Sequence, residues 1–190
     1  NLGDRRFLLE SLQSEHRLSV FIFDYRGYGR SEGIPSVKGA LLDAAAAREQ
    51  LARLAGVDTA DVVLMGRSLG RAIAIQRAAA KAPRGLIVES TSSSLKEIAA
   101  YHYPALAWLV PAGKLNSLAA IKRYEGPYLQ SHGTADTLIP FASGKKLFDA
   151  ANGPKRFIRI PRANHNDPQS PSYYRALDRF IKGLPKPPHE

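Results

Sequence analysis

The fold is decided by one stretch of sequence, Val62-Val63-Leu64-Met65-Gly66-Arg67-Ser68-Leu69-Gly70, which runs on into Arg71-Ala72-Ile73-Ala74-Ile75. An apolar run typical of a buried parallel strand stops at a Gly-x-Ser-x-Gly turn, and an alanine-rich helical stretch follows. A serine pushed out of such a turn needs a strained backbone and small neighbours, which Gly66 and Gly70 provide. The same letters also fit an ordinary turn that closes a strand. With this strand and helix around it, we interpret Ser68 as a nucleophile and the Leu69 amide as an oxyanion donor.

Length and composition bound the class of protein. The chain has 190 residues and 44% apolar residues, which predicts one globular domain, residues 1–190. There is no cysteine, which excludes a disulfide scaffold and a cysteine-ligated metal site. No apolar run approaches the ~18 residues of a membrane-spanning helix, and no signal peptide opens the sequence. We therefore expect a cytoplasmic location by default.

The net charge is +10, from 27 basic and 17 acidic residues. A charge of this size is compatible with an anionic membrane surface, nucleic acid or an acidic substrate. However, the basic residues are scattered in short pairs, with neither a continuous basic stripe nor interleaved aromatic residues. We expect a solvated basic surface, at most a weak contact with an anionic membrane surface, and no nucleic-acid binding.

Strand and helix patterns alternate along the chain. The apolar, β-branched runs predict strands at residues 18–23, 62–66, 85–90, 127–131 and 157–160. Helical periodicity follows or precedes them at residues 4–16, from Ser36 to Gly56, after the serine turn, at 141–151 and near the C-terminus. This alternation predicts a mostly parallel sheet covered on both faces, a three-layer αβα sandwich.

Residues 92–124 break the alternation. They are rich in aromatic residues and contain no clean strand pattern. An insertion of this length between two strands is typical of a cap. We expect short helices over the carboxyl ends of the strands, with Tyr103 or Trp108 lining an apolar substrate pocket.

A serine nucleophile needs a base, and the base needs an acid to orient it. His165 follows the last predicted strand and lies downstream of a suitable acid, in the order Ser, Asp, His. The other histidines are less suitable, since they lie in a surface helix, in the expected cap, directly after a strand or in the tail: His16, His102, His132 and His189.

Asp136 is the best candidate for the orienting acid, because it lies just beyond a strand end and before a helix. The alternative role of Asp136 is to cap that turn or the next helix. Glu89, after the preceding strand, is a reserve candidate. Asp167 is a weaker one because it lies only two residues from His165. Asp43 lies on a helix, which favours a structural role.

Over essentially the whole chain the sequence resembles the α/β-hydrolase superfamily, through four motifs whose order and spacing match the family. They are Asp24-Tyr25-Arg26-Gly27-Tyr28-Gly29-Arg30-Ser31, Gly66-Arg67-Ser68-Leu69-Gly70, His132-Gly133-Thr134-Ala135-Asp136 with Pro140, and Asn164-His165-Asn166-Asp167. Within the superfamily the sequence is most similar to Bem46-like and ABHD13- or ABHD17-like serine hydrolases, grouped with serine-aminopeptidase-like sequences. The resemblance implies Ser68 as nucleophile, Asp136 as acid, His165 as base and Leu69 as oxyanion donor.

The sequence departs from the family pattern in two places. Asn1-Leu2-Gly3 resembles the end of a loop that gives the second oxyanion amide, so we expect an incomplete N-terminal region without its first strands. In the family the absent strand lies between those of Val20 and Val63, which predicts a gap or altered pairing there. Arg71 stands where the family has a small residue, and we expect its side chain to point to solvent or to crowd the nucleophile.

The resemblance implies hydrolysis of esters, thioesters or amides by a Ser-His-Asp acyl-enzyme mechanism, with no cofactor and no metal. The partner would be a small-molecule or acylated substrate. The alternative is a catalytically impaired hydrolase fold that acts as a lipid- or protein-binding module.

Overall fold

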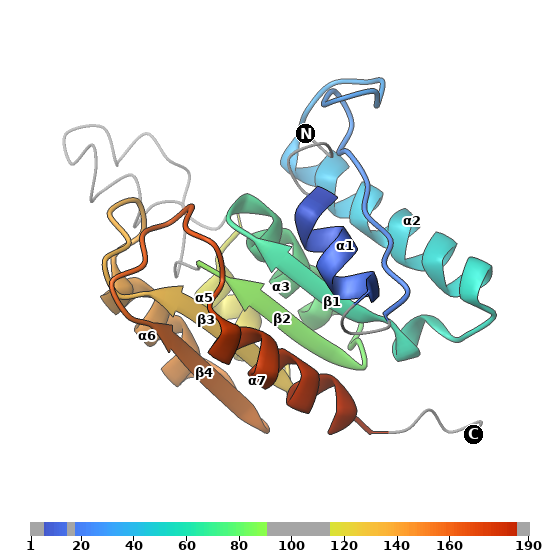
Figure 1. Cartoon of the computed structure of the whole chain (residues 1–190). Coiled ribbons are helices and arrows are strands. Elements are labelled where there is room, and N and C mark those ends of the chain that lie inside the picture. The colour runs from blue at the N-terminus through green and yellow to red at the C-terminus, as the bar shows by residue number, and fades with distance from the viewer. Residues whose placement is uncertain (1–5, 15–17, 91–114, 186–190) are drawn as a thin grey trace. The chain divides into compact units, whose positions relative to one another are not determined.

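The computed structural model describes residues 6–14, 18–90 and 115–185. They belong to two compact units, residues 1–59 and residues 60–190, which are described separately. Figure 1 gives the order of the elements along the chain. Among the described helices, none is long and apolar enough to cross a membrane. The expectation of a single domain stays a prediction.

The second unit is built on a parallel sheet. Its strands are β1 (Val63–Arg67), β2 (Gly85–Glu89), β3 (Tyr128–Gly133) and β4 (Lys155–Ile160), and their order in the described sheet follows the sequence. The two central strands are buried along their whole length, whereas β4 is largely exposed. Buried parallel strands favour continuous apolar runs, which is why the sequence pattern located β1 and β2, while shorter apolar segments located β3 and β4.

Helices cover both faces of this sheet (Figure 1). On one face lie α3 (Leu69–Ala80), α5 (Ser117–Ile121) and α6 (Phe141–Ala150), and on the other lies α7 (Pro171–Lys182). The core between α3, α5, α6 and the sheet includes Ile75, Leu86, Val88, Tyr128 and Leu147. The predicted α/β fold class, helices on both faces of a parallel sheet, is confirmed.

The expected cap lies mostly outside the described residues, and so do Tyr103 and Trp108. The described end of that range, residues 115–124, contributes buried residues to the core. Helix α5 is capped by Asn116, whose side chain accepts a hydrogen bond from the Ala119 amide, and both Ala120 and Ile121 are fully buried. These last residues belong to the helix layer that packs with α3.

The first unit contains α1 (Arg6–Ser14) and α2 (Val37–Ala55). Helix α2 begins after Ser36, whose hydroxyl accepts a hydrogen bond from the Gly39 amide, and it ends at Gly56, where φ is 67°. A serine before the helix and a left-handed glycine after it are strong start and stop signals. The predicted bounds of this helix are therefore confirmed.

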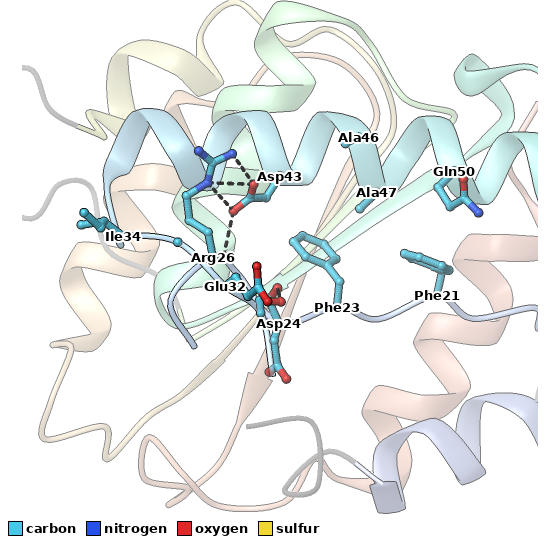
Figure 2. A pocket seen from close by; sticks show the side chains of 12 residues that line it. Phe21, Phe23, Asp24, Arg26, Glu32, Ile34, Asp43, Ala46, Ala47 and Gln50 are labelled. Carbon is cyan, nitrogen blue, oxygen red and sulfur yellow. Dashed lines mark hydrogen bonds and ion pairs between the residues drawn. The ribbon is translucent and has the colours of Figure 1, made fainter. Parts of the chain in front are cut away.

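The strand predicted at residues 18–23 was wrong. These residues form neither a helix nor a strand, and most of them are only partly buried. A strand needs a neighbour for its backbone hydrogen bonds, and the described part of the first unit contains no other strand. The two aromatic residues that suggested a strand instead face α2: Phe21 and Phe23 line a groove beside Ala46 and Ala47 (Figure 2).

An ion pair fastens this segment to α2. The Asp43 carboxylate accepts hydrogen bonds from the Arg26 amide at 3.0 Å, from Arg26 Nε at 3.0 and 3.1 Å and from Nη2 at 2.6 Å (Figure 2). The side-chain hydrogen bond from Arg26 lowers the pKa of Asp43 below its ordinary value. Asp43 thus has the structural role that its place on a helix suggested.

The turn between β1 and α3 is packed so tightly that only glycine fits at its first position. A Cβ atom on Gly66 would lie 2.5 Å from the Arg71 Cα and 2.6 Å from the Gly70 carbonyl oxygen. Both are backbone atoms, so a side chain at this position would force the helix away from the strand.

We therefore expect Gly66→Ala to lower the free energy of unfolding by about 1–3 kcal/mol, the usual range for overpacking. The measurement is urea unfolding followed by circular dichroism. Gly183→Ala is the matched control, because φ there is −87° and the nearest heavy atom to an added Cβ is 3.1 Å away. Equal losses in the two variants would contradict the tight packing of the turn.

Candidate active site

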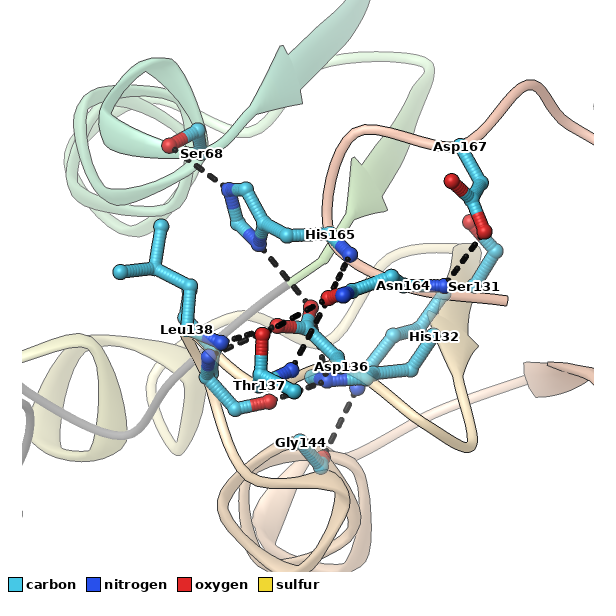
Figure 3. Close-up of polar contacts among 12 residues, drawn as sticks. Ser68, Ser131, His132, Asp136, Thr137, Leu138, Gly144, Asn164, His165 and Asp167 are labelled. Carbon is cyan, nitrogen blue, oxygen red and sulfur yellow. Dashed lines mark hydrogen bonds and ion pairs between the residues drawn. The ribbon is translucent and has the colours of Figure 1, made fainter. Parts of the chain in front are cut away.

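Ser68 lies between the end of β1 and the start of α3, with φ 53° and ψ −122°. This backbone conformation is rare for a residue with a side chain and persists only where the surroundings impose it. Ser68 occupies the N-cap position of α3, yet its hydroxyl makes no capping hydrogen bond. Instead, Ser68 Oγ lies 3.3 Å from His165 Nε2 (Figure 3). The strained turn thus turns the hydroxyl toward the histidine.

Asp136 lies in the loop after β3, and its two carboxylate oxygens have different partners. Oδ1 accepts hydrogen bonds from the Leu138 and Ile139 amides at 3.0 and 2.7 Å. Oδ2 lies 2.9 Å from His165 Nδ1 (Figure 3). The two roles considered for Asp136, turn cap and partner of the histidine, are therefore filled together, by one oxygen each.

The environment keeps Asp136 ionised. Burial alone would raise the pKa of Asp136, but the hydrogen bonds from His165 and the Ile139 amide, with the charges of His165 and His132, bring the pKa below its ordinary value. An ionised carboxylate only accepts hydrogen bonds, so His165 Nδ1 must carry a proton and donate it. In the neutral ring Nε2 is then an acceptor, and the Ser68 hydroxyl donates to it.

The loop that carries His165 is fixed to the loop that carries Asp136. Asn164 Oδ1 accepts hydrogen bonds from the Thr137 amide at 3.0 Å, from Thr137 Oγ1 at 3.1 Å and from the His165 amide at 2.7 Å (Figure 3). A Cβ atom on Gly133 would lie 2.2 Å from the Ala163 carbonyl oxygen, so the close approach of the two loops requires glycine there.

Arg67 fixes the same loop to β1. Its Nη2 donates to the His165 carbonyl at 3.1 Å and to the Asp167 carbonyl at 3.4 Å. Sequence analysis missed the roles of Arg67 and Asn164, although each stands next to a predicted site residue. Only the fold shows which backbone oxygens an arginine nearly 100 positions away can reach.

The reserve acids do not contact the His165 ring. Asp167 Oδ2 accepts a hydrogen bond from the Asn164 amide at 2.7 Å and so closes the loop locally. Glu89 is fully buried beside Tyr173, and the Ser68 amide donates to the Glu89 backbone carbonyl at 3.4 Å. Of the three candidate acids, Asp136 is the one that the structure brings to the histidine.

His132 is a second buried imidazole at this carboxylate. Its Nε2 donates to the Ile139 carbonyl at 2.9 Å and lies 3.5 Å from Asp136 Oδ2. Burial lowers the pKa of His132, which favours a neutral ring at pH 7. On its other side Nδ1 is so close to α6 that an added Cβ on Gly144 would lie 2.2 Å away. His132 therefore supports the Asp136 loop rather than facing Ser68.

Of the two expectations for the Arg71 side chain, exposure to solvent was wrong. Only 3% of Arg71 is exposed, and its side chain lies against the nucleophile residue, where Nη1 donates to the Ser68 carbonyl at 2.5 Å.

Leu69 is the first residue of α3, so its amide lacks an intrahelical acceptor, as at any helix start. Asn1-Leu2-Gly3 lies outside the described residues.

This chain is similar in sequence to known proteins. The sequence profile of the alpha/beta hydrolase family matches residues 4–136. An uncharacterised protein of Mycobacterium tuberculosis is 39% identical over 176 residues, which are 89% of this chain and 61% of that protein. The alpha/beta hydrolase domain-containing protein WAV2 of Arabidopsis thaliana is 30% identical over 88% of this chain and 60% of its own length. The chain thus spans about three fifths of these relatives.

Solved structures with the same fold include enzymes. An esterase of Pyrococcus furiosus superposes with a TM-score of 0.78 at 19% identity, covering 94% of this chain and 74% of that one. A monoacylglycerol lipase of Paleococcus ferrophilus gives a TM-score of 0.67 at 19% identity, with 94% and 88% covered. Likeness at this identity shows the fold, and the Bem46-like subgroup stays a prediction. By the extent of the family match, this chain belongs to the alpha/beta hydrolase family.

Proposed function

We propose that this chain carries the catalytic centre of a serine hydrolase that cleaves carboxylic esters through an acyl-enzyme. The observation that carries the proposal is the hydrogen-bonded series from Ser68 Oγ through His165 to Asp136, with separations of 3.3 and 2.9 Å. All three residues stand in loops or turns at the carboxyl ends of β1, β3 and β4, the edge where open parallel sheets bind ligands.

In the proposed reaction His165 Nε2 takes the Ser68 proton while Oγ attacks the substrate carbonyl carbon. The resulting imidazolium is stabilised by Asp136 and returns the proton to the leaving alkoxide as the carbon–oxygen bond breaks. Water, deprotonated by the same nitrogen, then hydrolyses the acyl-Ser68 ester. Thioesters and amides would follow the same route with a thiolate or an amine as leaving group.

The negative oxygen of the tetrahedral intermediate needs hydrogen-bond donors. The Leu69 amide is suited to this role, because it follows the nucleophile directly and opens α3, where the helix dipole also favours negative charge. The Leu69 amide is therefore proposed as a hydrogen-bond donor to this oxyanion.

The substrate class is supported by analogy. The esterase and the monoacylglycerol lipase described above have this fold, and both names denote enzymes that act on esters. An acylated small molecule is accordingly the proposed substrate, with Tyr103 and Trp108 as predicted pocket residues. Because the chain spans only 61% of the mycobacterial relative, the activity of a longer protein is equally a proposal.

We expect Ser68→Ala to abolish labelling by a fluorophosphonate probe and to lower kcat for p-nitrophenyl butyrate by about 10⁴- to 10⁶-fold, the usual cost of losing a catalytic serine. Ser19→Ala, at an exposed serine, is the control and should label like the unchanged protein. Absence of labelling in the unchanged protein would favour the alternative, a binding module with an inactive hydrolase fold.

We expect Asp136→Asn to lower kcat by about 10⁴-fold, because an amide nitrogen cannot hold His165 in the required tautomer. Initial rates with p-nitrophenyl butyrate measure this. The Asn side-chain oxygen can still accept from the Leu138 and Ile139 amides, so the fold should remain. A variant with more than about a tenth of the original kcat would contradict the orienting role.

The same variant has an expected pH signature in stability. Because the folded pKa of Asp136 is depressed, its carboxylate stabilises the fold above the unfolded pKa, and this contribution is lost as the pH falls toward the folded pKa. The stability difference between the unchanged protein and Asp136→Asn should thus be largest near pH 7 and shrink below about pH 4. Asp149→Asn, at an exposed ion pair with Lys145, should show little of this trend in urea unfolding.

A further inference from the structure

Arg71 holds the residue that carries the proposed nucleophile. The Ser68 carbonyl accepts two hydrogen bonds from this one residue, from the Arg71 amide at 3.2 Å and from Nη1 at 2.5 Å. A guanidinium is a planar fork that cannot lose its proton at neutral pH, so the contact is a charge-assisted hydrogen bond. The side chain is buried, which excludes most competing water.

Ser68 needs such a restraint. Its φ of 53° is unfavourable for a residue with a Cβ atom, and its own side chain makes no hydrogen bond to the helix start. Rotation of the Ser68 peptide groups toward an ordinary conformation would move both the hydroxyl and the Leu69 amide. A donor fixed on the Ser68 carbonyl opposes that rotation.

The backbone of Arg71 is itself immobilised by packing. Its Cα lies directly over Gly66, where an added Cβ would be only 2.5 Å away. The guanidinium therefore reaches back to Ser68 from a position that β1 fixes. Strand, nucleophile and helix are joined within six residues.

The charge of Arg71 also belongs to the site. Burial lowers the pKa of Arg71 to about 10, while the charges of Asp136 and Tyr128 oppose that change, so the guanidinium stays cationic at neutral pH. The charge of Arg71 also lowers the pKa of His132. Of the described groups, Asp136, Tyr128 and His132 thus interact with this charge, and Asp136 in turn faces the His165 and His132 rings.

We propose that Arg71 is a positioning residue: its hydrogen bonds to the Ser68 carbonyl hold the Ser68 hydroxyl and the Leu69 amide in the geometry of attack. This rests on the proposed function. The chain thus has an internal clamp on its proposed nucleophile.

The test compares Arg71→Met, which keeps length but removes the charge and the donors, with Arg71→Lys, which keeps the charge but loses the fork. Both are assayed with p-nitrophenyl butyrate, and kcat and KM are measured separately. Arg156→Met, at an exposed residue of β4, is the control with the same change in net charge. Circular dichroism establishes that each variant is folded.

For Arg71→Met we expect kcat to fall about 10- to 100-fold with KM nearly unchanged, the effect of a misplaced nucleophile. Arg71→Lys keeps a cationic donor and should retain more of kcat than Arg71→Met, whereas a role in packing alone would not distinguish these two side chains of similar length. Should Arg71→Met not fold, a lower kcat with an unchanged KM in Arg71→Lys still tests the proposal.

An unchanged kcat in Arg71→Met would overturn the clamp. Equal losses of kcat in Arg71→Met and Arg71→Lys would show a packing role only. If the unchanged protein neither hydrolyses the ester nor labels at Ser68, the proposed function fails and the positioning role with it. If the unchanged protein hydrolyses the ester and both Arg71 variants keep its kcat, this inference alone is refuted.

Discussion

The positive φ of Ser68 is the constraint on which the site depends. A residue in that conformation ends β1 abruptly, starts α3 without using its own hydroxyl as a cap, and leaves Oγ at 3.3 Å from His165 Nε2. The conformation is costly for serine, typically about 1–3 kcal/mol, so the surroundings must impose it. Gly66 allows the helix backbone to pack against the strand, and Arg71 donates a hydrogen bond to the Ser68 carbonyl.

The loops that meet this turn are restrained through backbone contacts more than through side-chain packing. Gly133 allows the Ala163 carbonyl to approach, and the Ala135 amide donates to that same carbonyl at 3.1 Å. Asn164 joins the acid loop to the base loop, while Arg67 joins the base loop to β1. Each loop is thereby held at two points, which is what precise placement of a proton-transfer group requires.

Periodicity in the sequence predicted those elements whose burial is decided locally. Apolar segments located β1 to β4, and Ser36 and Gly56 marked the ends of α2, because caps and strands leave a signature within a few residues. The segment 18–23 carried the same kind of signature but forms no strand, because pairing depends on a neighbour that periodicity does not reveal.

The candidate site was predictable in part for a similar reason. Ser68, Asp136 and His165 stand at strand ends in a recognisable order, so residue type and position suffice to nominate them. The sequence left two positions open for the Arg71 side chain, because it shows the size and charge of a side chain but not an acceptor within its reach. The Ser68 carbonyl becomes accessible to Arg71 only through the turn that Ser68 itself makes.

The proposed role of His165 rests on geometry and not on the family match. The matched profile covers residues 4–136 and so includes Ser68 and Asp136, but it stops before His165. What joins His165 to the other two is their placement in the second compact unit, residues 60–190, where all three lie. The two short separations therefore do not depend on where the first unit lies. Asp136 Oδ2 accepts from His165 while Oδ1 accepts from its own loop, so the position of His165 is tied to the fold of β3 and its turn.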